Sequence, residues 1–331
     1  MKIYITLDYE LYFGANSGTA QKSIIEPTEA LINIADKYEV KLVFFVDVGY
    51  LIKLKEYKSL DNRIAEEHKL VFEQVVNLAN SGHDIQLHIH PHWEDSYYDN
   101  GEWHIDTTRY KLSDFSEEEI MRIVTKYKSF IQKLVNMPVF AFRAGGWCMQ
   151  PFRKLKNALM ENEVWLDSTV FHGGYNSSKT HYFDFKRAPK KDYWKFEEDP
   201  MKINTDGYFT EIPITSKRLS PLFFWKLAFT KKTGGPLHKS FGDGTAAGGS
   251  KKDKLRMLTQ FSNSVVSIDG YKASYLKSAY QKAKSKNRNH FVVIGHPKAL
   301  TPYSLRKLDE FLAQIKNDNV ITFKDYSKNE V

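Results

Sequence analysis

Cysteine is almost absent from this chain, because the 331 residues include only Cys148. One cysteine excludes an intrachain disulfide framework and a cysteine-based metal cage. No run of 18 apolar residues occurs, so we expect no membrane-spanning helix. The first residues carry Asp8 and Glu10 where a signal peptide needs its apolar stretch. We therefore expect a cytoplasmic protein, with a peripheral position on the inner face of a membrane as an option.

The composition is that of a globular protein. Hydrophobic residues make up 42% of the chain, charged residues 27% and aromatic residues 14%. These values exclude wholesale disorder and allow a large core. We expect a single domain over residues 1–331, with insertions near 93–115 and 215–255.

Positive charge is concentrated in one segment. The net charge is +8, and residues 217–256 contain ten basic and two acidic residues, so this segment alone accounts for the excess. It includes the aromatic stretch from Leu219 to Phe229, and aromatic rings with a basic collar suit a membrane surface. The alternative is a core helix followed by a solvated basic loop. We expect no nucleic-acid binding, because no nucleic-acid module surrounds the patch.

Strand and helix patterns alternate along the chain. Apolar runs of strand length occur at 2–7, 41–47, 83–89, 139–142, 165–170, 209–214, 291–294 and 320–323. Helical spacing covers 61–80, 151–161, 272–284 and 302–316, and a capping box at Ser116–Glu119 opens a helix to about Asn136. Repeated strand–helix units predict an α/β fold with a parallel sheet, either open or closed into a barrel.

Ionisable residues stand at the ends of five predicted strands. They are Asp8 and Glu10, the cluster His88, His90 and His92, then Arg143, Asp167 and His296. Since the C-terminal ends of parallel strands converge on one face, these groups are expected to form one site.

The histidine cluster favours a metal site. Imidazole is a common ligand of divalent metals, and two imidazoles with one carboxylate leave a position open for water. On an extended strand His88, His90 and His92 would share a face, although Pro91 is expected to turn the chain between them. Asp8 and Glu10, two residues apart, can both face the same interior.

The remaining strand ends suggest roles in hydrolysis. Arg143 could pair with Asp8 or Glu10, or could be a salt bridge that only closes the barrel. Gly145 and Gly146 would allow a backbone N–H to approach an oxyanion. Asp167 and His296 form a candidate pair in which the carboxylate orients the imidazole.

These pieces, in this order, resemble the polysaccharide deacetylase family, the NodB-homology or carbohydrate esterase family 4 group. The most specific motif runs from Gly82-His-Asp to His88-Ile-His-Pro-His92. The resemblance implies a distorted (β/α) barrel of about seven parallel strands that removes acetyl groups from sugars with one divalent metal. That metal would be zinc, with cobalt, nickel or manganese as alternatives.

The resemblance also implies roles for individual residues. His88 and His92 would be metal ligands with Glu10, and Asp8 would be the general base, oriented by Arg143. The alternative is that Asp8 binds the metal and Glu10 is the base. His296, held by Asp167, would protonate the leaving amine. In this sequence Tyr9 separates the two acids, and Ala144-Gly-Gly-Trp147 replaces a proline-containing segment. We expect Trp147 or Trp93 to stack on the sugar.

The substrate is expected to be an acetylated amino-sugar glycan made inside the cell. Residues 217–256 suggest a lipid-linked intermediate, and a nucleotide sugar is the soluble alternative. Two other functions remain open: an amidase that acts on non-sugar C–N bonds, and a non-catalytic sugar-binding protein. A dead enzyme would be expected to lack one of the strand-end residues, and all of them are present.

Overall fold

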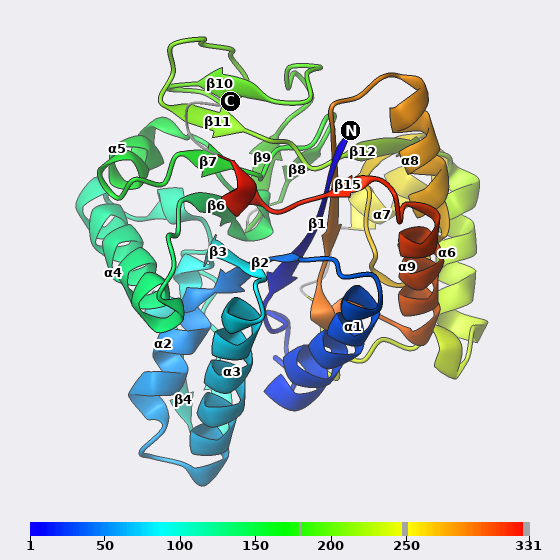
Figure 1. The fold of residues 1–331 in the computed structure, drawn as a ribbon. Coiled ribbons are helices and arrows are strands. Elements are labelled where there is room, and N and C mark those ends of the chain that lie inside the picture. The colour runs from blue at the N-terminus through cyan, green and yellow to red at the C-terminus, as the bar shows by residue number, and fades with distance from the viewer. Residues whose placement is uncertain (179, 247–250, 327–331) are drawn as a thin grey trace.

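The structure is a computed structural model that describes residues 1–178, 180–246 and 251–326. Its centre is a nine-stranded sheet in the order β10-β11-β7-β6-β3-β2-β1-β14, with β15 paired to β1 (Figure 1). The strands are β1 (Lys2–Tyr9), β2 (Val43–Asp47), β3 (Asp84–Ile89), β6 (Ala141–Ala144), β7 (Leu166–Asp167), β10 (Trp194–Phe196), β11 (Phe209–Glu211), β14 (His290–Gly295) and β15 (Asn319–Val320).

The seven neighbouring strands from β11 to β14 are parallel throughout. Their residues are almost all buried, as strands covered on both faces require. The sheet curls until Thr215, just after β11, exchanges hydrogen bonds with Val292 of β14: Thr215 N to Val292 O at 3.0 Å and Val292 N to Thr215 Oγ1 at 2.9 Å. The fold is therefore the predicted distorted (β/α) barrel.

Nine helices in the described residues surround this sheet, with α4 and α5 on one side and α1, α8 and α9 on the other (Figure 1). They are α1 (Glu26–Lys37), α2 (Val48–Tyr57), α3 (Asn62–Asn80), α4 (Glu117–Val135), α5 (Arg153–Glu161), α6 (Pro221–Thr233), α7 (Lys251–Thr259), α8 (Leu276–Ser285) and α9 (Pro302–Gln314). Side-chain caps begin three of them: the predicted capping box of Ser116 and Glu119 opens α4, Asp61 caps α3, and Thr301 caps α9.

Three small antiparallel pairs decorate the barrel. They are β4 (Tyr97–Asp99) with β5 (Glu102–His104), β8 (Tyr175–Ser177) with β9 (Tyr182–Asp184), and β12 (Ser216–Leu219) with β13 (Ser262–Val265). The first lies within the predicted insertion at 93–115, and the third encloses α6 and α7 within the basic segment. In the described part of the chain, none of the helices is both long and apolar enough to cross a bilayer.

Several predicted strands are shorter or shifted. The run 165–170 forms only the two-residue β7, and 320–323 contributes only Asn319–Val320 to the sheet. Apolar residues beyond these bounds, such as Val170 and Phe323, are buried but do not pair as strand residues. A run of apolar residues predicts burial, but it does not predict backbone hydrogen bonding between strands. The chain between α6 and α7 lies partly outside the described residues, and its described part packs beside the residues that follow β1.

Candidate metal centre and active site

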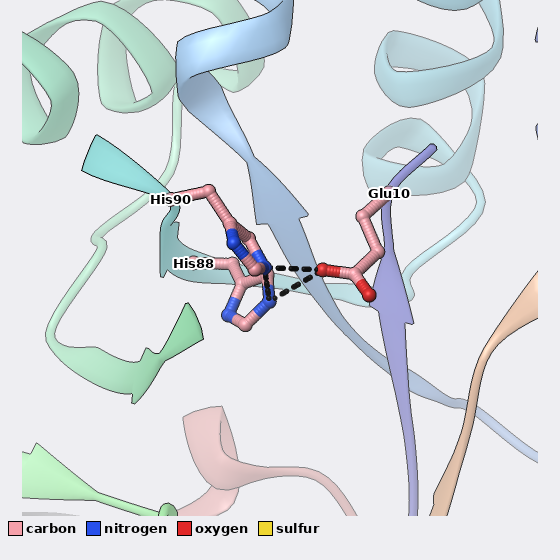
Figure 2. A group of neighbouring side chains, drawn as sticks. All are labelled: Glu10, His88 and His90. Carbon is pink, nitrogen blue, oxygen red and sulfur yellow. Dashed lines mark hydrogen bonds and ion pairs between the residues drawn. The ribbon is translucent and has the colours of Figure 1, made fainter. Parts of the chain in front are cut away.

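Glu10, His88 and His90 converge at the C-terminal ends of β1 and β3 (Figure 2). Glu10 Oε2 lies 2.9 Å from His88 Nε2 and 2.5 Å from His90 Nε2, and the two ring nitrogens are 3.1 Å apart. All three residues are buried. One carboxylate oxygen and two imidazole nitrogens that face a common point are a donor set for a divalent transition metal.

The chemistry of His88 also fits a ligand role. Its Nδ1 donates to the backbone carbonyl of Arg143 at 2.8 Å, because a carbonyl oxygen can only accept. In the neutral tautomer, Nε2 then keeps its lone pair and directs it at the common point. The Glu10–His88–His90 group could therefore hold a metal ion.

His92 does not join this group, so the ligand predicted there is corrected to His90. After His90 the chain turns at Pro91 into a short 3₁₀ helix, which carries the His92 ring away to stack on Tyr110 and Trp93. Neither ring nitrogen of His92 has a hydrogen-bond partner among the described residues. Burial holds the pKa of His92 well below its ordinary value, so its ring is neutral.

Lys298 is a member of the site that the sequence analysis missed. It follows β14, and its Nζ donates to Glu10 Oε1 at 2.9 Å and to the carbonyl of Leu11. Burial by itself raises the pKa of Glu10, but Lys298 and His90 outweigh that effect and hold it well below its usual range. Lys298 thus occupies one Glu10 oxygen while the other faces the two imidazoles.

Asp8 and Arg143 form the buried ion pair that the sequence suggested. Arg143 Nη1 donates to Asp8 Oδ1 at 2.6 Å, and the same guanidinium donates to Thr6 Oγ1 and to both the carbonyl and the hydroxyl of Ser168. Its plane also lies over the ring of Phe45. Because every arm of the Arg143 guanidinium is engaged, the Asp8 carboxyl group is held in one position.

His296 points its Nε2 at the two acids of β1, 3.6 Å from Asp8 Oδ2 and 3.9 Å from Glu10 Oε1. Its Nδ1 lies 2.8 Å from Asp269 Oδ2, and its backbone N donates to Asp269 Oδ1. Burial lowers the pKa of His296, but Asp269 together with Asp8 and Glu10 raises it above the ordinary value. His296 is therefore suited to carry a proton at neutral pH.

The predicted pairing of Asp167 with His296 is wrong. Asp167 accepts hydrogen bonds from the backbone N and the hydroxyl of Thr169, and it lies beside Glu211 on the neighbouring strand. Burial and the nearby Asp167 raise the pKa of Glu211 well above its usual range. Asp269, which follows an irregular stretch beside β14, was not found in the sequence because no strand pattern marks it.

Gly145 and Gly146 make room for the histidine cluster. A Cβ on Gly145 would lie 2.6 Å from the carbonyl of Ile89 and 2.7 Å from His90 Nδ1. Gly146 has a φ of 57°, and a Cβ there would meet His181 and Tyr110. Their predicted approach to an oxyanion stays a prediction.

The two tryptophans predicted to stack on a sugar, Trp93 and Trp147, differ in how deeply they are buried. Trp93 is fully buried, and its Nε1 donates to Asp47 Oδ2 at 2.6 Å, so it is a core residue and cannot stack on a sugar in this conformation. Burial raises the pKa of its partner Asp47 to about 7. Trp147 is half-buried against Phe171 and Phe183, and its role in sugar binding stays a prediction.

Access to the site is from the side of His296. The ring of Phe13 covers the other side, 4.2 Å from the His90 ring. The side chains of His296 and Asp269 are 20% and 18% exposed, whereas those of Asp8 and Glu10 are below 10%. Among these four side chains, those of His296 and Asp269 are therefore the most accessible.

Solved structures with the same fold include enzymes. The chain is similar to a protein assigned as a polysaccharide deacetylase from Mycobacterium smegmatis, with 17% identity and a TM-score of 0.51 over 96% of this chain and 85% of the other. It is also similar to an allantoinase, with 12% identity and a TM-score of 0.52 over 98% of this chain and 88% of the other. A 4-alpha-glucanotransferase from Thermococcus litoralis matches with 13% identity and a TM-score of 0.51 over 98% of this chain and 38% of its own.

No protein-family model and no curated protein matches the sequence. Identities this low establish the fold and not the activity. The likeness extends over nearly the whole chain and over most of the deacetylase. This chain therefore has the fold of the polysaccharide deacetylases, as the motifs in its sequence predicted.

Proposed function

We propose that this protein is a metal-dependent hydrolase that removes the acetyl group from an N-acetylated amino sugar of a glycan. The proposal rests on one observation: three groups of residues lie together at one end of the barrel. They are Glu10–His88–His90, Asp8–Arg143 and His296–Asp269. They correspond to a metal site, a fixed base and an oriented acid, the components that hydrolysis of an amide needs.

A divalent metal held by Glu10, His88 and His90 would polarise the acetyl carbonyl and make a water more acidic. Zinc suits two imidazoles and one carboxylate, and cobalt, nickel or manganese would also be accepted. Lys298 keeps Glu10 ionised and its other oxygen occupied, so a single carboxylate oxygen faces the two rings.

Asp8 takes the proton of the attacking water in this mechanism. Arg143 holds the carboxylate in place, and Asp8 Oδ2, the oxygen not bonded to Arg143, faces His296. The water oxygen forms the new C–O bond to the acetyl carbon. His296, with Asp269 on its Nδ1, donates the proton of Nε2 to the sugar nitrogen as the C–N bond breaks. The products are acetic acid and the free amine, and passage of the proton from Asp8 to His296 returns both groups to their starting states, so atoms and charges balance.

The substrate that we favour is a glycan intermediate carried on a lipid. The basic and aromatic segment 217–256 supports this choice, because it suits a substrate presented at a membrane surface. Hydrolysis of a non-sugar C–N bond is the second candidate, and the fold shared with an allantoinase favours it.

Metal content and acetate release, measured together, test the proposal. The wild type should contain about one metal ion per chain and should release acetate from N-acetylhexosamine oligosaccharides or their lipid-linked forms. His88→Ala should lose both properties, whereas Asp8→Asn should keep the metal and lose acetate release. Loss of metal in Asp8→Asn would make Asp8 a ligand. A metal-loaded protein that hydrolyses only a non-sugar amide would support the second candidate, and a protein that binds no metal would contradict both.

A further inference from the structure

Exposed apolar side chains gather on one part of the molecule, away from the catalytic groups. Of the large apolar side chains exposed in the described residues, the majority lie between 222 and 261: Leu222, Trp225, Phe229, Leu237, Leu255 and Phe261. Trp225 is 58% exposed and Phe229 is 70% exposed. A continuous group of this kind is uncommon on a monomer and marks an interaction surface. We call it the α6–α7 face.

Helix α6 presents these residues as a narrow stripe. At ~100° per residue, Leu222, Trp225 and Phe229 fall within an arc of about 60°. Lys226 borders the stripe on one side and Lys232 on the other. The inner side of the helix packs on the barrel, where Phe223 lies 5.6 Å from the ring of Tyr271 and 5.3 Å from that of Tyr275. Helix α6 is therefore packed against the barrel through its inner side while the stripe on its outer side is exposed.

Helix α7 and the residues after it extend the face. The Nε1 of Trp225 donates to the carbonyl of Leu258 at 3.0 Å, which ties α6 to α7. Leu255 on α7 and Phe261 just beyond it are both exposed, and the guanidinium of Arg218 lies over the ring of Phe261. The apolar area thus spans two elements and includes cations at its edge.

The cations of this face are not neutralised by the protein. Lys226 and Lys232, which border the stripe, are exposed, and they form no ion pair with any residue that the structure describes. The two acids of segment 217–256 are engaged elsewhere: Asp243 accepts hydrogen bonds from Thr19, and Asp253 lies 3.3 Å from Arg256. The face therefore carries a net positive charge around an apolar centre.

We propose that the α6–α7 face docks on a lipid bilayer that contains anionic lipids. Trp225 and Phe229 would enter the headgroup region, where aromatic rings are favoured, and the lysines would lie against anionic headgroups. Charge complementarity selects this occupant, because a second copy of the chain would bring the same unpaired lysines against each other. The proposal does not depend on the activity of the site.

The docking face and the catalytic groups are joined by one segment of chain. After α6, residues 239–246 return to the barrel, where Phe241 N donates to Leu300 O and Gly242 N donates to Lys298 O. Lys298 is the partner of Glu10. A protein docked through this face would therefore hold the segment beside its site next to the bilayer.

Vesicle co-sedimentation of the full chain tests the proposal, with vesicles of phosphatidylcholine with and without phosphatidylglycerol. We expect binding to the anionic vesicles and much weaker binding to the neutral ones. A Trp225→Ser/Phe229→Ser variant and a Lys226→Glu/Lys232→Glu variant should each bind anionic vesicles roughly 10- to 100-fold more weakly. Leu60→Ser, which removes an equally exposed leucine from the turn after α2, is the matched control and should bind like the wild type.

Two results of the vesicle experiment would overturn the proposal. One is the absence of wild-type binding to anionic vesicles, and the other is wild-type binding that both variants retain. Circular dichroism and thermal unfolding establish that the variants are folded, since all the changed side chains are exposed. Sedimentation of the vesicle-free protein gives a further check: if Phe229→Ser converts a dimer to a monomer, the face is an interface between copies of the chain and the lipid proposal fails.

Discussion

Asp269 binds His296 twice. Its Oδ1 accepts from the backbone N of His296 and its Oδ2 lies on the ring Nδ1, both at 2.8 Å. The two contacts fix the ring relative to its own backbone, so that Nε2 faces Asp8 and Glu10. A carboxylate placed in this way sets both the tautomer and the proton affinity of an imidazole.

Replacement of this carboxylate should change the pH profile of hydrolysis. In Asp269→Asn the pKa of His296 is expected to fall, because the negative charge that raises it is removed. The decline of kcat at high pH should then move to lower pH, and kcat should fall by roughly 10²–10⁴-fold. Asp167→Asn is the matched comparison, and it should leave the position of that decline unchanged because Asp167 contacts Thr169 instead. If only Asp167→Asn moved the high-pH decline of kcat, the result would support the predicted pairing of Asp167 with His296.

His90 and His92 should differ in metal binding. His90→Ala removes a nitrogen 2.5 Å from Glu10 Oε2, so metal affinity should fall by more than the ~10–100-fold typical of an outer-shell partner. His92→Ala removes a ring stacked on Tyr110 and should keep about one metal ion per chain. Elemental analysis after dialysis against a weak chelator measures both. The opposite order of metal retention would contradict the geometry of the site.

Gly145→Ala should weaken metal binding without removing a ligand. The added Cβ would lie 2.6 Å from Ile89 O and 2.7 Å from His90 Nδ1, and the strand cannot yield as a flexible side chain would. We expect a cost of about 1–3 kcal/mol, shared between displacement of His90 and loss of stability. Metal titration and thermal unfolding of the same preparation separate the two contributions. A variant with wild-type values in both measurements would show that the histidine has room to move.

Arg143 should be important for folding as well as for chemistry. Arg143→Met leaves Asp8 as a buried charge without its partner, so the free energy of unfolding should fall by about 3–5 kcal/mol. Arg122→Met is the control, since the Arg122 side chain is 56% exposed and its partner Glu94 keeps Lys126 as a second partner, so stability should change by less than ~1 kcal/mol. Urea denaturation at neutral pH measures both variants. Equal losses of unfolding free energy in the two variants would show that the Asp8–Arg143 pair is not desolvated.

His83 should make folding sensitive to mild acid. Leu42 N donates to His83 Nδ1, and burial lowers the pKa of the folded ring to about 4, whereas the unfolded ring titrates near ~6.5. Between these values the unfolded chain binds a proton that the folded chain does not, so stability falls as the pH falls from 7 to 4. The limit is about 3 kcal/mol, at ~1.4 kcal/mol per pH unit.

Buried acids such as Asp84 titrate in the same range, with a pKa raised to about 6 by burial, and they act in the opposite direction. The measurement is therefore the difference in unfolding free energy between the wild type and His83→Asn across this pH range. The difference should shrink toward low pH as the wild type loses its advantage. A constant difference would show that the folded ring titrates normally.

The sequence alone predicted which side chains share a face of a strand, where a helix begins and which residues follow the strands. The alternation of strand β1 puts Asp8 and Glu10 on one side of the chain, and the spacing of Ser116 and Glu119 defines the start of α4. The strand-end rule brought Asp8, His88, Arg143 and His296 to one end of the barrel because parallel strands in a repeating β–α chain must point the same way.

Choices between nearby partners were decided only by the tertiary structure. Several strand ends carry an acid, so the sequence cannot tell which carboxylate contacts His296. In the structure that carboxylate is Asp269, which follows the irregular stretch beside β14. The turn at Pro91 decides that His90 and not His92 faces Glu10. Lys298 was missed because the sequence does not show that β14 pairs with β1, and this pairing places the residues after β14 beside those after β1. Sequence patterns specify which face of an element is buried, whereas three-dimensional packing specifies which neighbours meet there.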